Sequence, residues 1–249
     1  MRFKFSDLLL YILIFIFVVA FPTDLLPVND TIKLLVEIGL RCLLVGFYIY
    51  LIIKNRIKIF GVANVKNVLI CMPFILISFS NILAALIDGG FYGLNSEVID
   101  VVLYSILTLL SVISEEIIFR LFIHNSLANT SSLKRIFASA GIFALLHLIN
   151  IVNVTTVDAL VEVLLQTVYT FGLGLLLGLM YEYSHSLTGT VIVHFGFNFF
   201  NTVIYKALGG HTSQLWFYLS AVICGVVVGL YAFLLYILYF RKVGRYFRQ

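Results

Sequence analysis

The chain is a succession of long apolar runs separated by short polar stretches. A helix of roughly 20 apolar residues crosses the ~30 Å hydrocarbon core of a membrane, because each residue adds about 1.5 Å. The pattern therefore predicts an all-α, polytopic membrane helix bundle of about eight transmembrane helices. The predicted crossings are Leu8–Phe21, Ile32–Ile53, Asn67–Ile87, Val98–Ile123, Ile136–Val152, Asp158–Tyr181, Leu187–Tyr205 and Leu215–Phe240.

Composition supports this interpretation and limits the number of domains. Hydrophobic residues make up 62% of the 249 residues, charged residues only 11%, and the mean hydropathy is +1.10. These values belong to a protein embedded in the lipid bilayer. Because no segment between crossings is long enough for a soluble domain, we expect one membrane domain over residues 1–249. Within it, residues 1–97 hold three helices, 98–205 are core helices that carry the motifs described below, and 206–249 hold the last helix and a basic tail.

The charges predict orientation rather than a nucleic-acid site. The net charge of +4 comes from residues in short loops and at the two ends, and positive charge gathers on the cytoplasmic side of membrane proteins. With eight crossings, most basic residues fall on one side, which predicts cytoplasmic N- and C-termini. The three cysteines lie in apolar runs without paired spacing, so neither a disulfide framework nor a zinc finger is indicated. The residues on the predicted cytoplasmic side are Arg2, Lys4, Lys54, Arg56, Lys58, Lys66, Lys134, Arg135, Arg241, Lys242, Arg245 and Arg248.

One apolar run carries an unusual group of ionisable residues, Glu115, Glu116 and Arg120. Each charge at the centre of a membrane helix costs about 2.5–3.5 kcal/mol on insertion scales. Glu116 and Arg120 are four residues apart, so they share a helix face and can form an ion pair. Glu115 points about 100° away around the helix. The spacing predicts a supporting ion pair beside one free carboxylate.

Other patterns predict packing and structure. Glu37 and Arg41 repeat the four-residue spacing and are expected to form a structural ion pair. Gly174 and Gly178 form a small-x-x-x-small pair that allows a neighbouring helix to approach closely. Three histidines fall near helix ends or in loops and are expected at the membrane interface: His124, His185 and His211.

Polar residues on two further helices lie at depths similar to that of Glu115. His147 and His194 are placed in the same slab of the predicted bundle, about 10–18 Å from the cytoplasmic ends of their helices. Sites inside helix bundles are built from such inward-facing side chains. We therefore expect one polar cavity that opens towards the cytoplasmic side.

The chemistry that suits this cavity is hydrolysis. A carboxylate in a low-dielectric setting binds a proton more readily, which makes Glu115 a candidate general base for water. His147 and His194 could orient that water, donate to the leaving nitrogen, or bind a metal. Asn198 lies one turn after His194 and offers an amide N–H to a developing oxyanion. Asn201 is on the same stripe and is a weaker candidate.

These residues together resemble three motifs of one family. Glu115-Glu116-x-x-x-Arg120, Phe143-x-x-x-His147 and His194-x-x-x-Asn198 are similar, in this order, to the motifs of the CAAX-protease and bacteriocin-processing (CPBP or Abi) family of intramembrane proteases. The resemblance covers about Ser111 to Asn201. It implies that Glu115 activates water, that His147, His194 and Asn198 complete the catalytic site, and that Phe143 is a structural companion. Family members are often called metalloproteases, and a divalent metal such as zinc would be held by Glu115, His147 and His194.

The resemblance also implies a substrate class and a location. We expect an integral protein of the bacterial cytoplasmic membrane that cleaves a membrane-associated peptide or protein, such as a bacteriocin or pheromone precursor. The signatures H-E-x-x-H, G-x-S-G and G-x-G-D of other intramembrane proteases are not found in the sequence. The alternative is a noncatalytic scaffold or immunity protein that binds a membrane-protein partner. A transporter with a buried carboxylate is less well supported, because the sequence has no internal repeat.

Overall fold

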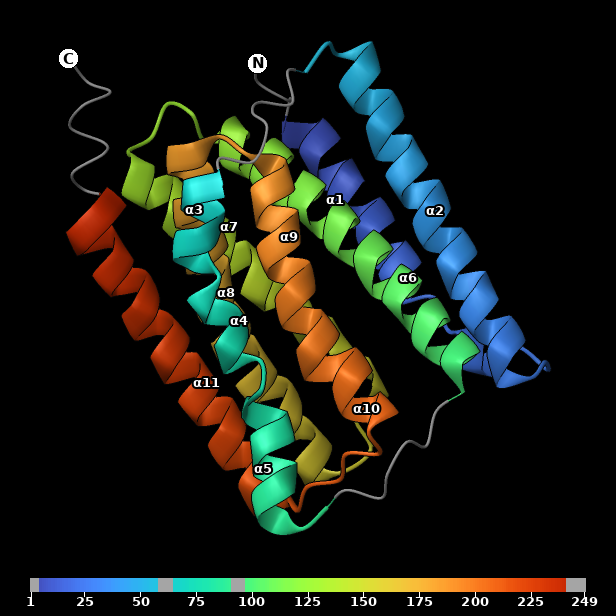
Figure 1. Cartoon of the computed structure of the whole chain (residues 1–249). Coiled ribbons are helices and arrows are strands. Elements are labelled where there is room, and N and C mark those ends of the chain that lie inside the picture. The colour runs from blue at the N-terminus through green and yellow to red at the C-terminus, as the bar shows by residue number, and fades with distance from the viewer. Residues whose placement is uncertain (1–4, 58–64, 91–96, 241–249) are drawn as a thin grey trace.

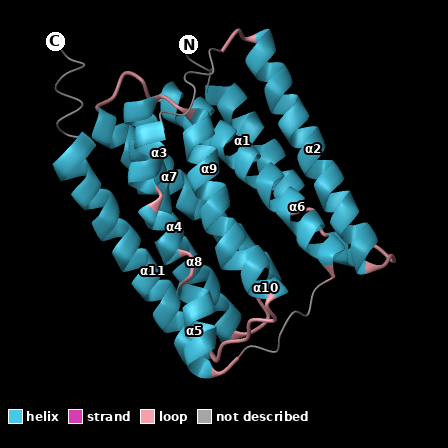
Figure 2. Ribbon diagram, viewed as in Figure 1, coloured by secondary structure: helices cyan, strands magenta, loops and turns pink. Residues whose placement is uncertain are grey.

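The structure is a computed structural model that describes residues 5–57, 65–90 and 97–240. All of the elements in these ranges are helical, as Figure 2 shows. The predicted all-α fold class is confirmed.

The helices follow one another along the chain with short connections. The first half contains α1 (Phe5–Val19), η1 (Thr23–Leu25), α2 (Asp30–Lys54), α3 (Val65–Cys71), α4 (Pro73–Ile77), α5 (Ser80–Asp88) and α6 (Val98–Glu116). The second half contains η2 (Ile117–His124), α7 (Ser132–Leu146), η3 (His147–Asn153), α8 (Val157–Ser184), α9 (Leu187–Asn198), η4 (Phe199–Ile204), α10 (Tyr205–Ala207), α11 (Gln214–Leu235) and η5 (Tyr236–Phe240).

Each predicted crossing has a helix in the structure, and seven of them are long and apolar enough to cross a membrane. These seven are Asp30–Lys54, Val68–Asp88, Val98–His124, Ser132–Val152, Val157–Ser184, Leu187–Ala207 and Gln214–Leu238. The first predicted crossing is shorter: α1 has 15 described residues. At about 1.5 Å per residue these residues rise about 22 Å, less than the ~30 Å of the hydrocarbon core.

Local sequence signals explain where several helices begin. The side chains of Asn29, Ser131, Thr156 and Ser186 each accept a hydrogen bond from a backbone N–H in the first turn of the helix that follows. This is the usual N-cap, which satisfies a donor that has no partner within the helix. The third crossing is not one continuous helix, because Pro73 is the first residue of α4 and lacks the backbone N–H that would continue α3.

Both described ends of the chain lie at the same end of the bundle. In Figure 1, α1 begins and α11 ends at the top, which we call the terminal end. The opposite, or distal, end holds the beginning of α6, the end of α5 and the short helix α10. α9 is central, since it packs against α6, α8, α3 and α4. α8 also packs extensively against α7 and α11.

Two glycines allow the close approach of α7 and α8. A Cβ atom added to Gly174 would lie 2.9 Å from the Ala140 Cα, and one added to Gly178 would lie 3.2 Å from the Ile136 side chain. The contact predicted from the small-x-x-x-small pair is therefore present, with α7 as the partner.

Much of the predicted charge asymmetry cannot be compared with the structure. Seven of the basic residues that predict cytoplasmic termini lie outside the described residues: Arg2, Lys4, Lys58, Arg241, Lys242, Arg245 and Arg248. The orientation of the termini stays a prediction.

Candidate active site

A buried ion pair between Glu116 and Arg120 forms the base of the candidate site. Arg120 Nε donates to Glu116 Oε2 at 3.2 Å, and both side chains are 0% exposed. The pair predicted from their spacing is confirmed. Two buried charges are tolerated only when they are paired and hydrogen-bonded, because each has left its water shell.

The remaining donors of Arg120 are held partly by α7. Arg120 Nη1 donates to Ser139 Oγ at 3.0 Å, and Ser139 Oγ donates to the Phe119 carbonyl at 3.0 Å. Phe119 and Arg120 belong to η2, a π-helical segment whose carbonyls depart from the α-helical pattern. The hydroxyl therefore supports both the arginine and the wider helical turn. The guanidinium also lies over the Phe143 ring, 5.5 Å from its centre.

His194 connects this pair to the free glutamate. Its Nδ1 lies 2.9 Å from Glu116 Oε1, and its Nε2 lies 3.6 Å from Glu115 Oε2. A carboxylate only accepts hydrogen bonds, so Nδ1 donates to Glu116, and in the tautomer that this contact favours Nε2 is an acceptor. Asn198 Nδ2 lies 3.3 Å from that Nε2, as a donor should. Arg120 thus orients Glu116, and Glu116 orients His194.

His147 is held in a similar way by its own helix. Its Nδ1 lies 2.9 Å from the Phe143 carbonyl, which can only accept, so the proton is on Nδ1 and Nε2 has a lone pair. The Phe143 ring packs edge-on against both His147 and His194, with ring centres 4.9 and 5.8 Å away. Phe143 is 1% exposed, as its predicted structural role requires.

All four predicted catalytic residues line one cavity of about 410 Å³, the central cavity. The side chain of Glu115 is 18% exposed, in contrast to the fully buried Glu116 next to it. A second cavity of about 190 Å³, the side cavity, shares Glu115 and His147 with the first and extends past Phe15 and Val19 of α1. The central cavity is lined by Glu37, Tyr104, Leu107, Thr108, Ser111, Glu115, Phe143, His147, Gln166, Tyr169, Thr170, Leu173, His194, Asn198, Asn201, Thr202 and Lys206.

The central cavity extends away from the terminal end of the bundle. From Glu115 its lining follows α6 back to Tyr104, and from His194 it follows the α9 segment forward to Lys206, so it leads to the distal end of the bundle. On the other side of Glu115, residues Ile117–His124 are all buried. An opening towards the cytoplasmic side and cytoplasmic termini, both predicted from the sequence, therefore cannot both hold, because the cavity leads away from the end where α1 begins and α11 ends.

The predicted ion pair between Glu37 and Arg41 is not formed. Glu37 Oε1 instead accepts from Thr23 Oγ1 at 2.6 Å, and Arg41 Nε donates to Ser111 Oγ at 3.1 Å. Four-residue spacing permits a pair but does not require it when tertiary partners compete. Arg41 consequently contacts α6 one turn before Glu115.

His124 was expected at the membrane interface but is 2% exposed. Its Nε2 lies 2.7 Å from Glu182 Oε2, and Glu182 also accepts from Arg135 Nε at 3.0 Å. This cluster ties η2, α7 and α8 together at the terminal end. Sequence reasoning missed it because Glu182 has no motif around it. His185 and His211 are exposed, and their place at the membrane interface stays a prediction.

The side chains present do not fit a closed metal site in this arrangement. Within the described residues, no group of three His, Cys, Asp or Glu side chains is placed to hold an ion. His194 Nδ1 is hydrogen-bonded to Glu116, and its Nε2 accepts a hydrogen bond from the Asn198 amide. A divalent metal such as zinc, held by Glu115, His147 and His194, stays a prediction that metal analysis of the purified protein would test.

Comparison with known proteins gives a family for the helices that carry the site. Residues 97–200 match the model of the family described as type II CAAX prenyl endopeptidase Rce1-like. The matched region begins just before α6 and includes Glu115, His147, His194 and Asn198. No curated protein and no solved structure matches the chain.

Proposed function

We propose that the chain is an intramembrane, glutamate-dependent endopeptidase, since residues 97–200, which carry the site, match the Rce1-like CAAX endopeptidase model. The observation that carries the proposal is the contrast between two adjacent glutamates. Glu116 is buried and bound by Arg120, whereas Glu115 faces the central cavity 3.6 Å from His194 Nε2. A scaffold would have no use for such a carboxylate.

In the first step, Glu115 acts as the general base. A water molecule in the central cavity gives one proton to the Glu115 carboxylate while its oxygen forms a bond to the carbonyl carbon of the substrate. The electrons of the C=O bond move to the oxygen. The Asn198 amide has two N–H donors: one is directed to His194 Nε2, and the second is available to this oxyanion.

In the second step, the C–N bond breaks. The electrons on the oxyanion re-form the C=O bond, and the leaving nitrogen takes the electron pair of the C–N bond and the proton held by Glu115, which returns to a carboxylate. His147 Nε2 can carry this proton across, because the other ring nitrogen is committed to the Phe143 carbonyl. One water is consumed, and the products are a carboxylic acid and an amine.

The substrate we propose is a membrane-associated peptide or protein in a bacterial cytoplasmic membrane. The side cavity supports this choice, because it reaches Glu115 from a wall made partly of the apolar residues Phe15 and Val19. An apolar segment held in the membrane could enter there and place a peptide bond at the junction with the polar central cavity.

The test compares wild type with Glu115→Gln and His194→Ala in cells that express the protein, using mass spectrometry of peptides in the membrane and the medium. We expect both variants to accumulate an uncut precursor at normal protein abundance, measured by immunoblot. Glu162→Gln is the matched control, since Glu162 is an exposed glutamate of α8 outside the cavities described above. If both site variants process peptides as wild type does, the enzyme proposal fails and the noncatalytic scaffold is favoured.

A further inference from the structure

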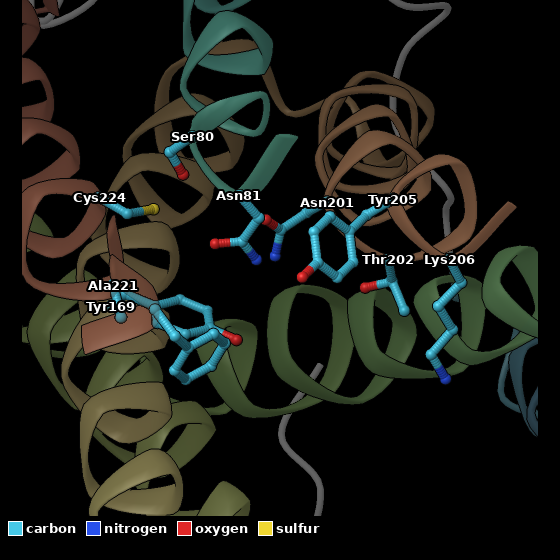
Figure 3. A pocket seen from close by; sticks show the side chains of 10 residues that line it. Ser80, Asn81, Tyr169, Asn201, Thr202, Tyr205, Lys206, Ala221 and Cys224 are labelled. Atoms are coloured by element: carbon cyan, nitrogen blue, oxygen red, sulfur yellow. The ribbon is translucent and has the colours of Figure 1, made fainter. Parts of the chain in front are cut away.

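Lys206 lies at the distal mouth of the central cavity, where three hollows meet. It lines the central cavity, a pocket of about 220 Å³ between α5, α8 and α11, and a third of about 280 Å³ beside Asp100. Figure 3 shows the second of these pockets, with Lys206 next to Thr202 at its edge and the amides of Asn81 and Asn201 near its centre. A substrate that lies in the hydrolytic site can therefore extend along the central cavity to this ammonium.

The ammonium of Lys206 has no acid partner among the residues that the structure describes. Its Nζ lies over the Tyr104 ring, 5.5 Å from the ring centre. It is the single Lys or Arg in the lining of the central cavity. Arg41, by contrast, is already hydrogen-bonded to Ser111. An exposed cation that lies over an aromatic ring and forms no ion pair among the described residues is available to an anionic ligand.

The helices give the spacing between this cation and the hydrolytic site. Lys206 follows His194 by 12 residues, and Tyr104 precedes Glu115 by 11 residues. At about 1.5 Å per residue both paths give roughly 17 Å along the bundle. An extended peptide covers about 3.3 Å per residue, so this distance corresponds to about five residues.

We propose that Lys206 is a specificity-determining residue that binds a carboxylate of the substrate about five residues from the hydrolysed bond. This inference rests on the proposed endopeptidase function and adds a substrate requirement to it. The carboxylate belongs either to the C-terminus of the peptide or to an Asp or Glu side chain. Lys206 lies outside the matched residues 97–200, so it is not one of the residues that carry the family resemblance.

The experiment uses the full-length protein in liposomes with three sets of peptides that have an N-terminal palmitoyl anchor and a randomised segment. The first set ends in a free carboxylate, the second ends in an amide, and the third ends in an amide but has one Glu at a varied position. Products are identified by mass spectrometry, and kcat and KM are then measured on the best peptide. For wild type we expect cleavage about five residues from the carboxylate, and poor cleavage of acid-free amides.

Lys206→Met should raise KM about tenfold on carboxylate peptides, equivalent to about 1.4 kcal/mol, with kcat little changed. It should leave the cleavage of acid-free amide peptides, the second set, unaffected. Lys54→Met is the matched control, because Lys54 also lies 5.5 Å from a tyrosine ring centre but is the last residue of α2, which ends at the terminal end of the bundle. Preference for the first set identifies a C-terminal carboxylate, and preference for the third identifies an acidic side chain.

Two different failures are distinguishable. Cleavage that depends on Glu115 but is equal for acids and amides, or that Lys206→Met does not change, overturns the role of Lys206 and leaves the endopeptidase intact. If no set is cut in a Glu115-dependent way, the proposed function fails, and the role of Lys206 fails with it.

Discussion

Breaking the buried pair of Glu116 and Arg120 should destabilise the bundle far more than breaking an exposed pair of the same length. Arg120→Met leaves the Glu116 carboxylate at 0% exposure without its counter-charge. Glu116→Gln leaves the guanidinium in the same position, while its amide oxygen can still accept from His194 Nδ1. The double variant removes both charges at once.

The size of the expected loss in unfolding free energy follows from the distance between the two charges and from their burial. At 3.2 Å and an effective dielectric constant of about 20, two unit charges attract by about 5 kcal/mol. Measured losses on removing one partner of a buried pair are about 3–5 kcal/mol, since the other charge stays buried. We therefore expect each single variant to lose about 3–5 kcal/mol of unfolding free energy. The double variant should lose no more than a single variant does. The coupling energy should be about 3 kcal/mol or more.

The assay is unfolding of the purified protein by SDS in mixed micelles, followed by circular dichroism and by the fluorescence of Trp216, the only tryptophan. The chain has a matched control pair, Asp30 and Lys33, which are also 3.2 Å apart, with the Asp30 side chain 99% exposed. The cycle of Asp30→Asn and Lys33→Met should give a coupling energy below about 1 kcal/mol. A coupling energy for the buried pair no larger than this would refute the reasoning.

Two further stability predictions use the same assay. Ser139→Ala should lower the free energy of unfolding by about 1–3 kcal/mol, because it leaves Arg120 Nη1 buried without an acceptor. Ser126→Ala removes a half-buried hydroxyl near a helix end and should lower this free energy by less. Gly174→Ala should cost about 1–3 kcal/mol because its Cβ would overlap the α7 backbone, while Gly141→Ala, with open space around it, should be neutral or stabilising by up to about 1 kcal/mol. Equal effects of the two glycine substitutions would contradict the close contact between α7 and α8.

The parts of the site that could be predicted from the sequence are those fixed by one helix alone. The face shared by Glu116 and Arg120, and the different direction of Glu115, follow from 3.6 residues per turn. The order of the apolar runs likewise predicted the helices, since a membrane requires each crossing to satisfy its own backbone. These features depend little on which helices are neighbours.

The features that could not be predicted depend on neighbours. Arg41 is bound to Ser111 of α6 rather than to Glu37, and His124 is buried because Glu182 of α8 meets it. Neither contact has a signature in sequence spacing. The direction of the central cavity relative to the termini could not be predicted for the same reason: it is decided by the packing of several helices together.

The distal position of the cavity mouth determines from which side of the membrane water and ions reach the catalytic residues. If the termini are cytoplasmic, as the basic residues predict, the water that Glu115 activates is drawn from the external medium. External acidity and salt would then reach the general base and Lys206 directly, while the cytoplasm, behind the packed segment Ile117–His124, would be insulated from both. Cleavage would respond to the surroundings of the cell without any signal crossing the bilayer.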